Sequence, residues 1–156
     1  MHELENYRYR GARALVLLHE RHLRSFLTTW RQAKAAGVTL PKTDHRAYRS
    51  LETILGHVLA AARGYMVWMC KQLGLPDPGI DPIPEDDELE ARVDAYLEHL
   101  LARWREPLAD VEEERFYTPT YPSNWGPPYC IDAMLEHTVM HPIRHEFQLR
   151  ELLERP

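Results

Sequence analysis

Apolar residues recur at three- and four-residue steps along four stretches of this 156-residue chain, with polar residues between them. That spacing is typical of amphipathic helices, and the strict alternation of a half-buried strand is not found in the sequence. The predicted helices cover Leu4–Ala36, a segment from Thr43 or Asp44 (as N-cap) to Leu73, a segment from Asp86 or Asp87 that Pro107 breaks or kinks, and Cys130–Leu153. Gly37 and Gly74 are expected to end the first two helices, and a short helical tail to Arg115 is expected after Pro107.

Two linkers separate these helices. The segment LPDPGIDPIPEDD, residues 75–87, cannot be helical because of its prolines, and it is long enough to cross the end of a bundle. The segment FYTPTYPSNWGPPY, residues 116–129, is rich in aromatic side chains, which can form a lid over one end of the helices or bind a flat ligand. The pattern therefore predicts an all-α four-helix bundle with long crossover linkers, formed as a single domain by residues 1–156.

The composition excludes some classes of partner. Lys and Arg number 19 against 24 Asp and Glu, and the formal net charge of −5 argues against nucleic acid. Cys70 and Cys130 are too few for a disulfide framework and are expected to be reduced thiols in the cytoplasm. The apolar run Ala14–Leu18 is too short for a membrane span or a signal peptide, so no membrane partner is expected.

Three histidines, His137, His141 and His145, lie four residues apart within the last predicted helix. At the histidine content of this chain, such a run is expected about 0.03 times by chance. Each four-residue step rotates by about 40° around a helix, so His141 and His145 share a face and can converge on one metal ion. A solvated histidine stripe is the alternative.

Pro142 follows the second of these histidines directly. Inside a helix, proline removes one backbone hydrogen bond and clashes with the carbonyl four residues earlier, here that of Thr138. We therefore expect a kink in the last helix, or a helix that restarts at Pro142. Either outcome favours His141 and His145 as a ligand pair and places His137 outside the first coordination shell, where it would edge the pocket or bond a nearby group.

His57, His19 and His22 also lie on predicted helices. His57 is in the middle of the second helix, where small residues between Gly56 and Gly64 let another helix approach or leave room for a ligand. On residue pattern alone, a hydrogen-bonded core histidine is the more frequent case. His19 and His22 lie beside the apolar stripe of the first helix, and neither has a histidine partner four residues away. They are expected to edge the core with a hydrogen bond rather than to bind metal.

His57 and the last helix together resemble the DinB-like superfamily, whose members are small bacterial four-helix bundles with one histidine on the second helix and an H-x-x-x-H pair on the fourth. The fourth helix of that family often has the pattern H-x-x-x-H-R-x-Q. Residues 141–148 are HPIRHEFQ, with Glu146 where arginine is common, and a histidine one turn earlier, as at His137, also occurs in the family. Helix order, linker lengths and total length agree over nearly the whole chain.

The resemblance implies that His57, His141 and His145 bind one divalent metal, with zinc or nickel as the expected ion. The residues expected to line the pocket are His137, Tyr65, Trp125 and Gln148. Because the family includes thiol S-transferases, the implied function is a metal-dependent enzyme that acts on a small-molecule electrophile with a low-molecular-weight thiol as co-substrate. A metal-dependent hydrolase and a non-catalytic stress-response or metal-sensing bundle are the alternatives, and a homodimer is left open.

Other side chains near the motif are expected to play no direct part. Glu136 and Glu146 are adjacent to ligand positions but should point to other faces of the helix, so no residue is identified as a general base. His2 and His45 are expected not to affect the metal. Imidazole must be neutral to bind metal, so from an ordinary pKa of about 6.5 we expect affinity to fall below about pH 6.

Overall fold

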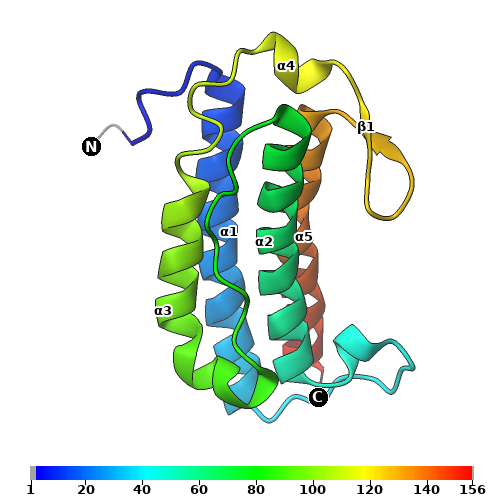
Figure 1. Ribbon diagram of the computed structural model, residues 1–156. Helices are drawn as coiled ribbons and strands as arrows, with labels where there is room; N and C mark the ends of the chain where they lie inside the picture. The colour runs from blue at the N-terminus through cyan, green and yellow to red at the C-terminus, as the bar shows by residue number, and fades with distance from the viewer. Residues whose placement is uncertain (1–2, 156) are drawn as a thin grey trace.

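The computed structural model describes residues 3–155, which are mostly helical (Figure 1). His2 lies outside this range. The elements are α1 (Arg10–Ala35), the 3-10 helix η1 (Arg46–Tyr48), α2 (Leu51–Leu73), α3 (Asp86–Trp104), α4 (Glu114–Tyr117), β1 (Tyr121–Pro122), β2 (Pro128–Tyr129) and α5 (Ile131–Glu154). The predicted all-α class is confirmed in that most of the described residues are helical.

The four long helices lie side by side, with α5 against α1 and α2, and α2 against α3 (Figure 1). Tyr9 donates a hydrogen bond to Asp132 near the start of α5 (3.3 Å), and Ser25 donates one to Glu146 further along (2.8 Å). Residue numbers rise in the same direction along both helices from the first contact to the second, so α1 and α5 are parallel. Between α2 and α3, residues 74–85 are not helical, as the prolines predicted, and they return along the length of the helices rather than across one end (Figure 1).

An apolar core fills the space between the helices and determines which face of each helix is buried. The indole of Trp30 is buried and donates to the carbonyl of Leu51 (2.6 Å), and that of Trp104 donates to the carbonyl of Ala62 (3.0 Å). Each large ring thus buries its apolar area without leaving an unpaired polar atom. No helix within residues 3–155 is long and apolar enough to cross a bilayer.

The start of α1 differs from the prediction, because residues before Tyr9 are not helical. Tyr7 is buried and its hydroxyl donates to the carbonyl of Arg105 (2.7 Å), while the backbone N–H of Arg8 donates to the carbonyl of Ala109 (2.9 Å). The segment is therefore tied to the end of α3. These tertiary contacts override a helical pattern that is continuous in the sequence.

The start of α2 is also later than predicted, since neither Thr43 nor Asp44 is its N-cap. Ser50 is the cap: its hydroxyl accepts from the N–H of Thr53 (3.1 Å), and the Thr53 hydroxyl accepts from the N–H of Ser50 (3.0 Å). This reciprocal capping box contributes about 1 kcal/mol to helix stability. The helix ends as predicted at Gly74. Its φ of 69° lies in the left-handed region, which glycine adopts without strain because it has no Cβ.

After Trp104 the chain leaves the helix before Pro107, as expected, but the predicted helical tail to Arg115 is wrong. Residues 105–113 are turns and irregular chain, and the one-turn helix α4 begins at Glu114. The segment that follows contains a short antiparallel hairpin. It was not predicted, because the sequence has no strand alternation there. Tyr121 pairs with Tyr129, and Gly126 at the tip has a φ of 116°. The hairpin brings Trp125 back towards α5.

Helix α5 continues from Ile131 to Glu154 through Pro142, so the predicted restart at Pro142 is wrong, whereas the kink stays a prediction (Figure 1). Pro142 is buried, and α5 packs against α1 and α2 along its length. This packing holds the helix together although the Thr138 carbonyl loses its usual donor. The hydroxyl of Thr138 donates to the carbonyl of Met134 (2.7 Å). Because α5 is unbroken, His141 and His145 extend from one helical segment.

Candidate metal centre

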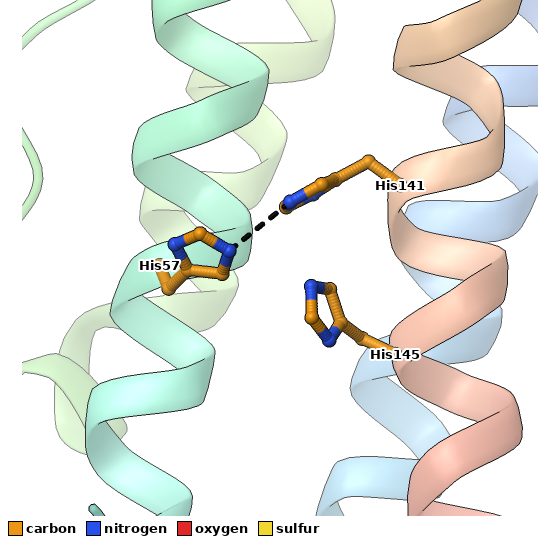
Figure 2. Close-up of side chains that lie close together, drawn as sticks. All are labelled: His57, His141 and His145. Carbon is orange, nitrogen blue, oxygen red and sulfur yellow. Dashed lines mark hydrogen bonds between the residues drawn. The ribbon is translucent and has the colours of Figure 1, made fainter. Parts of the chain in front are cut away.

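Three histidine side chains meet between α2 and α5 (Figure 2). His57 extends from α2, and His141 and His145 extend from α5, so that one ring nitrogen of each lies within 4.8 Å of the others. Nε2 of His141 is 3.1 Å from Nε2 of His57. The structure therefore brings together the three residues predicted as ligands, and this group could hold a metal ion.

The spacing of two of the three nitrogens fits a shared divalent metal. Two imidazole nitrogens bound to one tetrahedral zinc ion at 2.0–2.1 Å lie about 3.3 Å apart. The 3.1 Å between His57 and His141 is close to that value. Nε2 of His145 is buried and has no hydrogen-bond partner among the described residues. An unpaired buried nitrogen costs free energy, and a shared metal ion would supply the missing partner.

The tautomer of His145 is fixed by its neighbour one turn along α5. Nδ1 of His145 lies 2.9 Å from Oε1 of Gln148. An amide oxygen only accepts, so Nδ1 carries the proton and donates. Nε2 then presents its lone pair to His57 and His141. Ligating histidines are commonly oriented in this way by a second hydrogen bond, and Gln148 supplies it here.

Burial keeps these imidazoles neutral. Desolvation, followed by the charges of the neighbouring His145 and His57, lowers the pKa of His141 to about 2. Desolvation also lowers the pKa of His145 to about 4, against the opposing effect of its bond to Gln148. The pKa of His57 is lowered by desolvation as well. Protons should therefore displace a metal at a lower pH than the value near 6 that free imidazole predicts.

His137 lies outside the group of three, as expected from its place on the helix. Its ring stacks on Trp125 (centroids 5.1 Å apart) and meets Tyr65 and Tyr129 edge-on (5.4 and 5.7 Å). We call these four residues the aromatic cluster. It adjoins the metal group through Tyr65, whose ring is 5.8 Å from that of His141. Of the predicted pocket residues, Tyr65 therefore lies beside the site and Trp125 lies one ring further away.

Two residues near the site were not predicted. The ring of Tyr48, from η1, is 5.7 Å from the rings of both His57 and His145. His45 is exposed, but its ring lies 4.5 Å from that of Tyr48. The sequence holds no signal for this, because the residues precede α2 and their position depends on how the loop folds back. His45 is consequently a poorer control residue than its exposure suggests.

Glu146 points away from the metal group, towards α1, as predicted. Its carboxylate is buried and accepts hydrogen bonds from Ser25, Thr29 and Arg150 (2.8, 2.8 and 2.7 Å). Burial alone would raise the pKa of Glu146, but these donors hold it below its usual value. The carboxylate thus ties α5 to α1 at the level of the site. Glu136 is exposed.

His19 is a buried histidine of a different kind, and its predicted hydrogen bond is absent. Its side chain is 1% exposed, and neither ring nitrogen has a partner among the described residues. Its ring centroid is 4.0 Å from that of Trp104. Burial lowers the pKa of His19 to about 3, so it is a neutral core residue rather than one at the edge of the core. His22 is half-buried.

A cavity of about 280 Å³ borders the site on the side of Gln148. Tyr48 and Gln148 separate it from His145, and most of its remaining wall is apolar. The lining residues are Leu40, Pro41, Thr43, Tyr48, Ile54, Gln148, Leu149, Glu151, Leu152 and Arg155. Its lining includes Gln148, which bonds Nδ1 of His145, and none of the three histidines.

Comparison of the chain with protein-family models, curated proteins and solved structures found no match. The likeness to the DinB-like superfamily accordingly rests on the histidine motif and the order of the helices.

Proposed function

We propose that the chain is a DinB-like four-helix bundle that binds one divalent transition metal through His57, His141 and His145. We further propose that it uses the metal to activate a low-molecular-weight thiol for transfer to a small electrophile. The observation that carries this proposal is the composition of the group: three neutral nitrogens, and no fourth His, Cys, Asp or Glu atom with them in residues 3–155. Catalytic metal sites typically have three protein ligands, whereas structural sites have four.

Three imidazoles favour zinc or nickel over harder ions. Imidazole nitrogen suits zinc, nickel, copper and iron in their divalent states, while magnesium and calcium prefer oxygen ligands. When bound, such an ion would lower the pKa of a coordinated thiol or water. The three histidines differ in exposure, since His141 and His145 are buried and His57 is half-buried. Access to the ion is therefore expected from the side of His57.

The surrounding residues have roles that follow from their contacts. Gln148 holds the ring of His145 with its Nε2 lone pair inward, and Glu146 fixes α5 against α1. On one flank of the group, the aromatic cluster packs against His141 through Tyr65 and would limit the access of water on that side. Trp125 is 47% exposed at the hairpin tip, where it can contact a small substrate. These residues bind and orient, and none acts as a base.

A metal-dependent hydrolase is the second candidate, because a set of three histidines also suits activation of water, as in carbonic anhydrase. The same ligand set would serve both reactions. A non-catalytic metal-sensing role is the third outcome that the test below must separate from the first two.

The test is metal analysis of protein purified without a histidine tag, followed by reloading with zinc or nickel and assays of thiol transfer. We expect one equivalent of metal per chain and metal-dependent consumption of a thiol with a small electrophile. A His57→Ala, His141→Ala double variant that bound one equivalent at wild-type affinity would refute the site. Metal binding with ester hydrolysis but no thiol transfer would favour the hydrolase, and metal binding with neither activity would favour a sensor.

A further inference from the structure

The cavity of about 280 Å³ near the metal group is formed where the chain between α1 and α2 lies beside the end of α5 (Figure 1). Its floor consists of the buried core side chains of Ile54 and Leu149. The half-buried side chains of Leu40, Tyr48 and Leu152 contribute to its walls. Apolar groups that line a hollow of this kind gain further burial only when a molecule of matching polarity fills it.

The volume of the cavity limits the size of that molecule. An engineered apolar cavity of about 150 Å³ holds benzene. The volume of about 280 Å³ is larger, and it is at the lower end of the range of about 300–1,000 Å³ that is typical of pockets for larger ligands. The cavity therefore suits a molecule with one ring and a short side chain, rather than a nucleotide or a long lipid chain.

The polar residues of the lining favour an uncharged molecule with a hydrogen-bond acceptor. Glu151 and Arg155 carry opposite charges and are both exposed, so together they offer no net charge to a charged ligand. The hydroxyl oxygen of Thr43 accepts from the N–H of His45 (3.1 Å), so its O–H is a donor that a ligand can use. A charged group that entered the apolar part of the cavity would lose its hydration without gaining a partner there.

Gln148 connects the cavity to the metal group. Its Oε1 accepts from Nδ1 of His145 (2.9 Å), and the same side chain lines the cavity. Because this bond uses the amide oxygen, the amide NH2 is the group that can donate to an occupant. Tyr48 is a second shared residue, since it lines the cavity and its ring is 5.7 Å from those of His57 and His145. An occupant would therefore contact two side chains that also contact the predicted metal ligands.

We propose that this cavity binds a small uncharged molecule with an apolar body and a carbonyl oxygen, which accepts a hydrogen bond from the amide NH2 of Gln148. This binding requires no metal. A second part of the proposal rests on the proposed function: the occupant and the metal strengthen each other's binding. The reason is that the amide held in place by the occupant is the one that orients His145.

The first experiment titrates full-length, metal-free protein with 4-phenylbutan-2-one, which has one ring, a short chain and a carbonyl. Methyl signals of Ile54, Leu149 and Leu152 report binding in carbon-13-labelled protein, and nuclear Overhauser effects from the ring protons to the Ile54 methyl locate the probe. From the size of the probe we expect a Kd in the low millimolar range. The charged analogues 3-phenylpropionate and 3-phenylpropylamine should bind at least about fivefold more weakly.

Wild-type protein whose Ile54, Leu149 and Leu152 signals do not respond to the ketone would overturn the proposal. Equally tight binding of either charged analogue would contradict the selection of an uncharged molecule. The location of the probe is determined in the wild type, so this result does not depend on whether any variant folds.

Variants test the cavity and its donor separately. Leu152→Trp and Leu40→Trp each add an indole at the cavity wall and should weaken the ketone by more than about tenfold. Leu18→Trp, at an exposed position on α1 that does not line the cavity, should match the wild type. Gln148→Leu should weaken the ketone by about fivefold, as for one lost hydrogen bond, and should not weaken toluene, which has no acceptor. Circular dichroism verifies that each variant is folded. Wild-type affinity for the ketone in both folded tryptophan variants, or equal weakening of ketone and toluene in Gln148→Leu, would overturn the proposal.

The link to the metal group is measured by equilibrium dialysis with zinc, with and without the ketone. The zinc affinity of the wild type should rise by up to about fivefold, at the lower end of typical couplings between two sites, and that of Gln148→Leu should not change. An unchanged or lower zinc affinity in the wild type would reject the link. If the wild type binds no zinc, the proposed function fails, and the titration of metal-free protein still decides whether the cavity is a ligand site.

Discussion

Histidines are buried in two regions of this protein, and the two regions differ in what the ring nitrogens face. His19 lies in the core against Trp104, and both of its nitrogens lack partners among the described residues. His141 and His145 are equally hidden, but their rings face each other and His57. In all three buried rings, desolvation lowers the pKa.

Burial alone therefore does not identify a ligand. It keeps imidazole neutral in both regions, which metal binding requires, but it also leaves unpaired ring nitrogens, at a cost of about 1–3 kcal/mol for each ring. Only the convergence of several lone pairs gives a metal something to bind. A single ion at the group of three would recover part of that cost, whereas His19 belongs to no group of three possible ligand residues within residues 3–155. The comparison predicts opposite outcomes for substitutions in the two regions.

The largest expected effect is the loss of metal from His141→Ala. Removing a ligand should weaken metal binding by more than about 100-fold, because even the loss of a supporting hydrogen bond costs 10- to 100-fold. His19→Ala, which removes an equally buried histidine, should leave stoichiometry and affinity unchanged. Equilibrium dialysis with elemental analysis measures both, and far-UV circular dichroism verifies that each variant is folded. A similar loss in His19→Ala would contradict the separation of the two regions.

A smaller effect is expected at Gln148, which has no counterpart at His19. In Gln148→Leu the Nδ1 proton of His145 loses its acceptor, and the ring can turn or change tautomer. Metal affinity should fall by about 10- to 100-fold. Gln148→Glu retains an oxygen acceptor and should keep most of the affinity. If Gln148→Leu bound metal as tightly as the wild type, the hydrogen bond would not orient the ligand.

The pH dependence of metal binding tests how deeply the group is buried. Three ordinary imidazoles with a pKa near 6.5 would each lose about 30-fold by pH 5, or about 30,000-fold together. With the pKa of His141 near 2 and that of His145 near 4, only His57 can compete for protons at pH 5, and its pKa is also lowered. Affinity should therefore fall by less than about 30-fold between pH 7 and pH 5. Dialysis at both pH values checks this, and a thousandfold loss would show that the group is more open.

The long helices could be predicted from the sequence because each buries one face, and burial imposes a regular spacing on apolar residues. Their ends depended on other interactions. Ser50 caps α2 with Thr53 as its partner, whereas the usual signature has Glu or Gln at that position. Residues before Tyr9 have a helical pattern, but contacts with Arg105 and Ala109 determine their conformation.

The candidate site was predictable to the extent that it lies on one helix. The spacing of His141 and His145 requires them to share a face, and this held because packing keeps α5 continuous through Pro142. The distance of His57 from the other two histidines depends on how α2 packs against α5. His57 was predicted as a ligand because of the family resemblance and not because of its spacing in the sequence. Tyr48 was not found for the same reason, since η1 reaches the site only through the fold.

The smallest effect expected at pH 7 is a gain in stability from His19→Leu. Leucine fills a similar volume and removes two unpaired polar atoms, a change worth about 1–3 kcal/mol, but it also loses the contact with Trp104, worth about 0.5–1.5 kcal/mol. The free energy of unfolding of metal-free protein should therefore rise by about 1 kcal/mol. The gain should increase as the pH falls from 6.5 towards 3, because the unfolded chain protonates this histidine near 6.5 while burial lowers the folded pKa to about 3. Urea unfolding at pH 7 and pH 5 measures this, with the half-buried His22→Leu as control. A loss of stability in His19→Leu at both pH values would mean that the His19 nitrogens are satisfied in solution, and the contrast between the two regions would then fail.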